Sequence, residues 1–415
     1  MSSKFPMKTM AHLPMDIIND LFLLLPATTL VRFRVLSKPC SSLIDSPDFV
    51  ASHLRRNIET GDHLMILLRA PRVLRTVYLD SPDNKVSDVD HPLQSGGFTE
   101  VFGSVNGLVG LTNSPVDMAL FNPSTRKIHR LPIEPVEFPD RLITHKYVLY
   151  GLGYDLVNED YKVVRMIQRK KVHHDDMVGY EIKVFSLKRN SWKSVHLQFE
   201  VQIKFFYFYY HVLYRRQNGV QVRNSLNWIL PRGNRVAINT IIRLDLASEE
   251  FEFVFYPVDF FYENKMDLCV LDGCLCMMSY NELSHVDVWI KREYEAEGSW
   301  SKLFSVTKPE GVESLDFVRP LKYTKDKSKV LLEINVGKLV WFDLASESFQ
   351  TLGIKDCEGS CSAEIVVSSL VLGCKGDPRN ARENIMMQQS SNKDGFMSKG
   401  FKLKLLLEQI NEKWS

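Results

Sequence analysis

The first part of the chain, residues 12–54, carries apolar residues at helical spacing. These residues recur three or four positions apart, which predicts a short amphipathic helix. Pro26 ends that helix, because proline disrupts a helix interior. Ser37 and Ser46 are good N-caps for later helices, and each has a proline in the turn that follows. The apolar positions of the first helix are Leu13, Ile17, Ile18, Leu21, Phe22, Leu24 and Leu25.

The pattern predicts three or four short helices in this N-terminal region. So few residues cannot bury all of their apolar surface among themselves. The first helix is apolar on two faces, so one face must meet another surface. That surface belongs either to the chain's own second domain or to a partner's groove. The pattern alone leaves both alternatives open.

From about Asp62 the hydrophobic period changes from that of a helix to that of a strand. A unit of strand, polar turn and second strand returns along the chain. Its equivalent positions are 64, 59, 45 and 52 residues apart, close to the period of about 40–50 residues typical of propeller blades. These positions are Phe121, Phe185, Leu244, Trp289 and Trp341.

Five copies of the unit can be recognised, and the two ends of the region supply a sixth. Tight turns precede several copies, at Asn106-Gly107, at Asn224 and at Asp272-Gly273, each entering an apolar inner strand. The strands near residues 63–79 and the segment Glu364–Leu372 could together complete a further blade. Such closure removes open sheet edges. We predict six blades; a seven-bladed ring or an irregular sandwich are the alternatives.

The helical segment resembles the F-box. The resemblance lies in Leu13-Pro14-Met15-Asp16-Ile17-Ile18, Leu25-Pro26, Leu36-Ser37-Lys38, Leu43-Ile44 and Ser46-Pro47-Asp48-Phe49. One departure is Cys40, which stands where F-boxes usually carry tryptophan. The resemblance implies binding to a Skp-type adaptor and, through it, to a cullin. The residues expected at or beneath that contact are Leu13, Pro14, Ile17, Ile18, Leu21, Leu25, Pro26, Leu30 and Leu36.

The repetitive region, with its sequence Asn122-Pro123-Ser124-Thr125-Arg126, is similar to the F-box-associated domain of plant F-box proteins. The expected fold class is therefore α+β multidomain, with a small helical F-box followed by an all-β propeller. The segments 61–69, 100–104 and 367–376 are close to one family member that restrains plant immunity. That similarity implies turnover of nucleotide-binding leucine-rich-repeat receptors. The expected divisions are an extension at 1–11, the F-box at 12–56, the propeller at 62–376 and a polar, largely flexible tail at 377–415.

Composition narrows the possible partners and the compartment. The chain has 52 basic and 50 acidic residues, a net charge of +2, which does not suggest a charge-driven nucleic-acid or membrane surface. No apolar run approaches the roughly 20 residues that span a bilayer, and residues 1–11 lack a signal-peptide pattern. The seven cysteines are odd in number and scattered, as expected of free thiols. We expect a cytoplasmic and nuclear protein with no membrane insertion.

The clusters that could support chemistry do not form a catalytic pattern. His173-His174-Asp175-Asp176 lies among basic residues and is best interpreted as a solvated loop. Cys274 and Cys276 share a strand, and no second pair at zinc-finger spacing follows, so buried thiols are favoured. No phosphate-binding glycine loop and no Gly-x-Ser-x-Gly turn is found. We therefore expect no enzyme activity, no metal and no cofactor.

The most unusual stretch is the aromatic run Phe205–His211, followed by several arginines. One interpretation is a strand buried on both sides. The other is an aromatic anchor for a bound target, rimmed by basic residues, because tyrosine and arginine are enriched in binding hot spots. The candidate target-binding residues are Tyr207, Tyr209, Tyr210, Arg215 and Arg216.

Three functional hypotheses follow. The leading one is a two-ended adaptor: the helices hold the cullin assembly, the propeller holds a target, and proximity promotes ubiquitin transfer. The second is a non-ligase scaffold, which binds its adaptor without target turnover. The third is a propeller enzyme with an appended binding motif. The last would require titratable groups that converge in the propeller's central channel.

Overall fold

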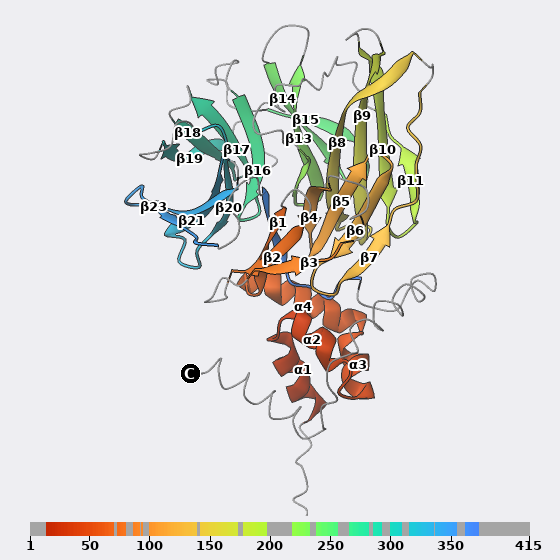
Figure 1. The fold of residues 1–415 in the computed structure, drawn as a ribbon, viewed down its shortest axis with the longest axis vertical. Coiled ribbons are helices and arrows are strands. Elements are labelled where there is room, and N and C mark those ends of the chain that lie inside the picture. The colour runs from red at the N-terminus through yellow and green to blue at the C-terminus, as the bar shows by residue number, and fades with distance from the viewer. Residues whose placement is uncertain are drawn as a thin grey trace, which may run out of the picture.

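The protein folds into a group of helices beneath a ring of β-sheets (Figure 1). The computed structural model describes residues 14–69, 73–79, 86–91, 93, 99–138, 142–172, 177–196, 218–232, 238–255, 265–281, 285–292, 299–308, 315–335, 337–354 and 362–372. In this part of the chain no helix is long and apolar enough to cross a membrane.

Of the four helices in the described residues, the last two begin at the predicted capping serines, and the first two begin after a proline without a side-chain cap. Ser37 accepts a hydrogen bond from the Cys40 N–H at 3.2 Å, and Ser46 accepts one from the Phe49 N–H at 3.3 Å. Gly61, at φ 64°, ends the last helix in the left-handed conformation that glycine adopts without strain. The helices are α1 (Met15–Leu23), α2 (Ala27–Phe33), α3 (Lys38–Ile44) and α4 (Pro47–Thr60).

Within the described residues, six four-stranded antiparallel sheets follow, one for each predicted blade. Blade 1 consists of β24 (Ser362–Val367), β1 (Leu64–Arg69), β2 (Leu74–Tyr78) and β3 (Ser87–Val89). Blade 2 consists of β4 (Glu100–Val105), β5 (Leu108–Ser114), β6 (Asp117–Asn122) and β7 (Lys127–Arg130). Blade 3 consists of β8 (Ile143–Asp155), β9 (Asp160–Lys171), β10 (Met177–Ser186) and β11 (Ser191–Ser194).

The second half of the ring repeats the same arrangement. Blade 4 consists of β12 (Val220–Val222), β13 (Ser225–Arg232), β14 (Ile238–Asp245) and β15 (Phe251–Val254). Blade 5 consists of β16 (Lys265–Leu271), β17 (Cys274–Asn281), β18 (His285–Lys291) and β19 (Trp300–Thr307). Blade 6 consists of β20 (Val318–Tyr323), β21 (Lys329–Ile334), β22 (Lys338–Asp343) and β23 (Phe349–Thr351).

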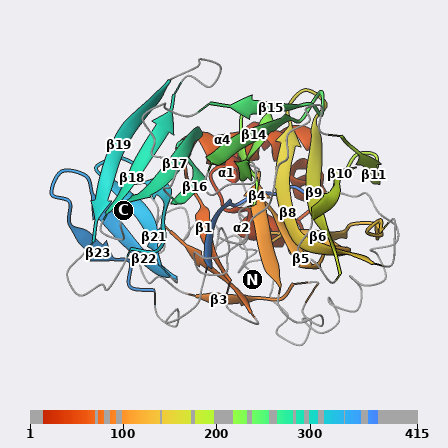
Figure 2. The ribbon, with the colours of Figure 1, turned by 90° about the horizontal axis from the view of Figure 1, so that it is seen from above.

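The ring is closed by strands from opposite ends of the chain. β24 pairs with β1 in antiparallel register, from Leu64 opposite Val367 to Arg69 opposite Ser362. The innermost strands contact one another in the order β24, β4, β8, β12, β16, β20 and back to β24, so they surround a centre (Figure 2). The prediction of a six-bladed propeller closed by its two ends is therefore confirmed.

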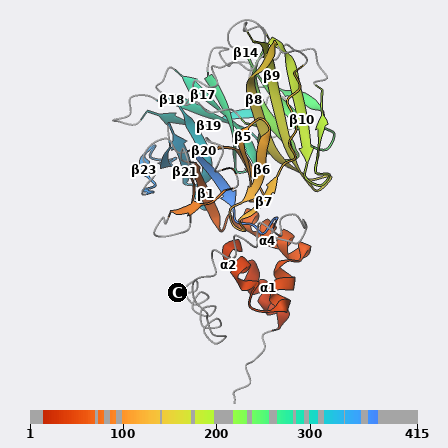
Figure 3. The ribbon, with the colours of Figure 1, turned by 45° about the vertical axis from the view of Figure 1, so that its right-hand side comes forward.

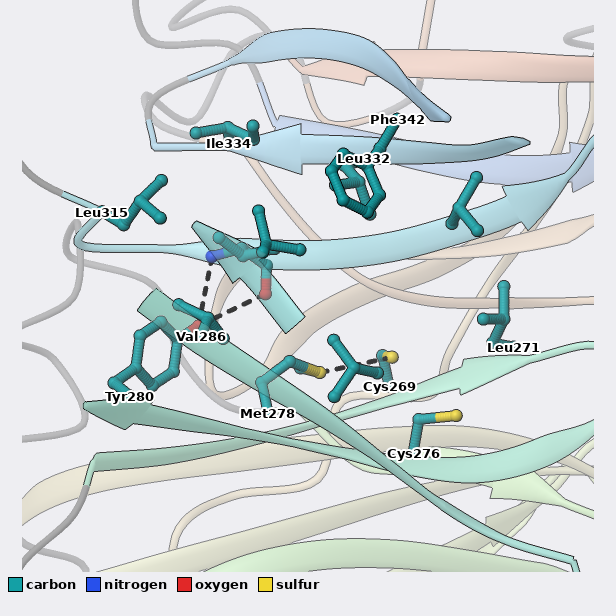
Figure 4. Close-up of a cluster of buried hydrophobic side chains, with 14 of the residues drawn as sticks. Cys269, Leu271, Cys276, Met278, Tyr280, Val286, Leu315, Leu332, Ile334 and Phe342 are labelled. Carbon is teal, nitrogen blue, oxygen red and sulfur yellow. Dashed lines mark hydrogen bonds between the residues drawn. The ribbon is translucent and has the colours of Figure 1, made fainter. Parts of the chain in front are cut away.

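Apolar side chains between neighbouring blades form the core. Between blades 5 and 6, Met278, Val286 and Leu332 are fully buried in one cluster, with Tyr280 at its edge (Figure 4). The Tyr280 hydroxyl accepts from the Val318 N–H at 3.2 Å and donates to its carbonyl at 3.3 Å. Fully burying an apolar side chain such as Met278, Val286 or Leu332 contributes roughly 1.5–3 kcal/mol to the free energy of folding. Because successive side chains of a strand point to opposite faces of its sheet, each blade packs against both of its neighbours.

The repeat positions recognised in the sequence occupy one structural place. All five lie on the third strand of successive blades, β6, β10, β14, β18 and β22. The tight turns at Asn106-Gly107 and Asp272-Gly273 join the first and second strands of their blades, so each enters the second strand rather than the innermost one. The last strand ends earlier than the predicted segment Glu364–Leu372: β24 ends at Val367, and residues 368–372 leave the sheet.

Candidate adaptor-docking face and propeller channel

Apolar side chains are exposed on α1, which lies away from the propeller in Figure 1, and in the turn after α2. Met15 and Ile17 of α1 are exposed, Ile17 by 46%. Val35, in the turn after α2, is 74% exposed. Large apolar side chains on a small helical domain mark a binding surface when they lie together. Met15 stands in the F-box pattern and Val35 directly precedes its Leu36, but neither was among the residues expected at the contact.

The residues expected at the adaptor contact fall into three groups. Pro14 and Ile17 are exposed, whereas Leu30 is fully buried and supports the face from beneath. Leu13 lies outside the described residues. The half-buried group is Ile18, Leu21, Leu25, Pro26 and Leu36. Their role in adaptor binding stays a prediction.

Cys40 occupies the position where the F-box pattern has tryptophan. Its side chain is half-buried and packs against the cluster formed by Leu30, Ile44 and Phe49. The smaller side chain still contacts the helical core and leaves the N-cap of α3 intact. The departure therefore reduces packing area without changing the local fold.

The helices are joined to the propeller by the segment that follows β24, Ser368–Leu370, called here the closing segment. The Ala27 N–H, at the start of α2, donates to the Ser368 hydroxyl at 3.2 Å. The Asn57 side chain of α4 donates to the Ser368 carbonyl at 3.0 Å. Leu370 is buried in the same core cluster as the helical residues. Figure 3 shows β24, in blue, beside β1 and above the helices.

The closing segment is held from its other side by blade 2. The Asn122 side chain donates to the Ser369 carbonyl at 3.1 Å and to the Val371 carbonyl at 2.7 Å. The turn glycine Gly107, at φ 81°, lies so close that a Cβ there would meet the Ser369 hydroxyl at 2.3 Å. The segment therefore lies between the propeller and helices α2 and α4.

A buried histidine takes part in the same junction. His53 of α4 is fully buried, and its Nε2 donates to the Leu25 carbonyl at 2.8 Å. Its Nδ1 faces the Asn57 side-chain N–H at 3.5 Å, so a proton there would have no acceptor. Burial lowers the pKa of His53, and the nearby His63 and Arg56 lower it further, against the Leu25 hydrogen bond that raises it. His53 is therefore a neutral, structural residue.

A cavity of about 1230 Å³ lies along the axis of the ring. Its wall includes residues of all six innermost strands together with the α4 residues Leu54, Arg55 and Ile58. The cavity thus extends to the helical domain, and α4 forms part of one end. A cavity of this size exceeds most small-ligand pockets.

Charged side chains in the channel wall pair with one another across blades. Arg319 of β20 bonds Glu333 at 3.0 Å and Glu364 of β24 at 3.2 Å, and it also donates to the Ala363 carbonyl. Glu364 accepts from the Ser104 hydroxyl of β4 at 3.2 Å. Burial opposes the charge of Arg319, but Glu333 and Glu364 outweigh it and raise its pKa. These groups link blades 6, 1 and 2, and the positive charge persists at any physiological pH.

Of the two thiols predicted to be buried, Cys274 and Cys276, one is fully buried. Cys276 is fully buried and Cys274 is half-buried, both on β17. Cys276 lies opposite Cys269 in the ladder, and the Cys269 thiol donates to the Met278 sulfur at 3.5 Å (Figure 4). Contact with Cys276 and burial raise the pKa of Cys269, which keeps it a thiol. Within the described residues no group of three metal-capable side chains is found.

The candidate target-binding residues cannot be placed. Tyr207, Tyr209, Tyr210, Arg215 and Arg216 lie outside the described residues, as do His173–Asp176, Cys357 and Cys361. The two interpretations of the aromatic run stay predictions.

Comparison with protein families covers most of the chain. The family described as F-box associated beta propeller domain matches residues 63–362. The F-box domain family matches residues 10–52. The two matches follow the division between the helices and the ring.

Three curated relatives from Arabidopsis thaliana match over nearly their whole length. F-box protein At4g22390 is 61% identical over 404 residues, and F-box protein CPR1 is 57% identical over 416 residues; each match covers 95% of this chain and 100% of the relative. F-box/kelch-repeat protein At3g23880 is 27% identical over 375 residues, 87% of this chain and 95% of the relative. The resemblance read from the sequence motifs is therefore confirmed at the level of the whole chain.

Proposed function

Because this chain belongs to the family of F-box proteins with an F-box-associated β-propeller, we propose that it is a substrate-recognition subunit of a Skp–cullin–F-box ubiquitin ligase. The helical end binds a Skp-type adaptor and, through it, a cullin. The propeller end binds a target protein, which is ubiquitinated and sent to the proteasome. The observation that carries the proposal is an F-box with exposed apolar side chains at Pro14, Met15, Ile17 and Val35.

The protein's contribution to the reaction is positional. Members of this family are adaptors, and the catalytic cysteines belong to the other ligase components. Holding the target's lysines near a charged conjugating enzyme makes the transfer effectively unimolecular, which is worth several orders of magnitude in rate. A rigid junction between helices and propeller serves that purpose, and the contacts around Ser368 supply one.

The targets proposed are nucleotide-binding leucine-rich-repeat immune receptors, whose turnover would restrain plant defence. This proposal is supported by the similarity to F-box protein CPR1, the family member that segments 61–69, 100–104 and 367–376 resemble. The compartment proposed is cytoplasm and nucleus, where such receptors and free thiols are both found. A fluorescent fusion of the full chain, imaged in plant cells, tests the compartment.

Replacing Leu13 and Pro14 with alanine tests the ligase function. The variant is expected to lose adaptor co-purification and to lengthen the half-life of the bound target. Enrichment in the presence of a proteasome inhibitor, comparing the intact protein with the variant, identifies that target. Lost adaptor binding with an unchanged target lifetime would favour a non-ligase scaffold. Absence of immune receptors from the enriched proteins would contradict the proposed target class alone.

A further inference from the structure

The side-chain amide of Asn122 stabilises its own turn and also donates hydrogen bonds to the segment after β24. In blades 4 and 6 the turn after the third strand begins with Asp245 or Asp343, whose Oδ1 accepts from the N–H groups two and three residues ahead. Asn122 occupies the same place in blade 2. Its Oδ1 accepts from Ser124 at 2.8 Å and from Thr125 at 3.2 Å. The carbonyl oxygen of the amide is therefore sufficient for the turn.

The amide nitrogen of Asn122 is free for another role. It donates to the Ser369 carbonyl at 3.1 Å, the Ser369 hydroxyl at 3.2 Å and the Val371 carbonyl at 2.7 Å. Asn122 is fully buried, so these bonds are made without competition from water. An aspartate would keep the turn, yet it has no hydrogen to donate and would place a negative charge against two carbonyl oxygens.

The residues held by Asn122, Ser369 and Val371, alternate with the two that contact the helices, Ser368 and Leu370. Ser368 accepts the Ala27 N–H, one of the first N–H groups of α2, which otherwise have no partner within the helix. Its carbonyl accepts from Asn57 of α4, and Leu370 fills the helical core. Helix α2 begins directly after Leu25 and Pro26, both expected at the adaptor contact. The closing segment therefore contacts the first residue of α2, next to two of the residues expected at the adaptor.

We propose that Asn122 is a positioning residue for adaptor docking, and that the closing segment couples closure of the propeller ring to adaptor affinity. The inference rests on the proposed adaptor binding and adds to it the element that controls it. β24 closes the ring, and its continuation completes the F-box. Because such coupling is reciprocal, the adaptor stabilises the closing segment as much as the closing segment stabilises the docking face.

The test compares the full chain with two opposite exchanges in equivalent turns. Asn122→Asp removes the donors to the closing segment, and adaptor affinity, measured by calorimetry with a purified Skp-type adaptor, is expected to fall about 5-fold or more. Asp245→Asn makes the reverse exchange in blade 4, where the Oδ1 serves only its own turn in hydrogen bonds to Ala247 and Ser248. Adaptor affinity is expected to stay at the wild-type value in this control.

A second measurement uses the unaltered protein and does not depend on how well a variant folds. Hydrogen exchange of the wild-type chain is compared with and without the adaptor. Slower exchange in residues 362–371, on the side of the helices away from the docking face, is the expected result. Unchanged exchange there overturns the coupling. A variant Asn122→Asp with a lower melting temperature but wild-type adaptor affinity at 25 °C makes the residue merely structural and also overturns it.

These outcomes are distinct from failure of the proposed function. If the wild-type chain does not bind the adaptor at all, the ligase assignment is wrong. If the wild-type chain binds and the Asn122→Asp variant binds equally well, the ligase assignment stands and the positioning role is wrong.

Discussion

At the scale of single residues, Ile17 offers the sharpest test of the docking face. Its side chain is 46% exposed on α1, so a charge there is tolerated by the fold and disturbs only a partner. We expect Ile17→Asp to weaken adaptor binding by at least about 10-fold, the effect of losing a central apolar contact. A titration with the purified adaptor measures it. Ile133→Asp, at a 77% exposed isoleucine of the propeller, carries the same charge change and should bind normally.

His53 gives a second prediction at this scale, in the dependence of stability on pH. Its pKa is lowered in the folded state by burial, so the unfolded chain binds the proton more readily. The stability it contributes is complete above the unfolded pKa of about 6.5 and is lost as the pH falls toward the folded pKa. Denaturant unfolding of the full chain between pH 7.5 and pH 5 should therefore show falling stability.

The control for the histidine prediction is His53→Gln. Glutamine does not titrate in this range, so the slope of the free energy of unfolding against pH should decrease by up to the contribution of one bound proton. His91, whose pKa burial also lowers, contributes to the remaining slope in both proteins. An equal slope in wild type and variant would show that His53 does not carry the effect.

At the scale of elements, the closing segment behaves as part of the helical domain. Leu370 is buried with Phe22, Leu30 and Ile44, although it follows the last propeller strand. Leu370→Ala should lower the free energy of unfolding by about 2–5 kcal/mol, because it leaves a cavity in a small core. Chemical denaturation followed by circular dichroism measures the loss. A loss below 1 kcal/mol would mean that Leu370 lies outside the core in solution.

The elements also show how far sequence patterns reach. Helix limits were predictable because Pro26, Ser37 and Ser46 act locally. The third strands were predictable because the same unit of strand, polar turn and second strand recurs at Phe121 and its counterparts. The junction was not, because the bond from Ala27 to Ser368 joins residues 341 positions apart and has no local pattern. Asn122 was noticed only as part of a family motif, and its second role required the position of its nitrogen.

At the scale of the whole molecule, a group of polar contacts joins the blades on either side of the point where the ring closes. Arg319 joins blade 6 to β24 through Glu364, and Glu364 is joined to blade 2 through Ser104. Glu333 is fully buried and paired with the same guanidinium. Ser104, Arg319 and Glu364 line the channel, and one guanidinium pairs with both carboxylates, which fits a structural role. The sequence did not identify them, because they lie on four different strands of three blades.

Removing the guanidinium therefore tests the closure of the ring as a whole. Arg319→Met leaves the buried carboxylate of Glu333 without its partner, so the free energy of unfolding should fall by about 3–5 kcal/mol. The double variant Arg319→Met with Glu333→Leu removes both charges and should recover a large part of that loss. Lys327→Met breaks an exposed pair with Asp272 and should change stability by less than about 1 kcal/mol. If Arg319→Met and Lys327→Met gave equal losses in denaturant unfolding, the channel pairs would not hold the ring closed. Repeating the unfolding measurement with adaptor present is expected to raise the stability of Arg319→Met, because the adaptor and the Arg319 ion pairs both act on β24 and its continuation.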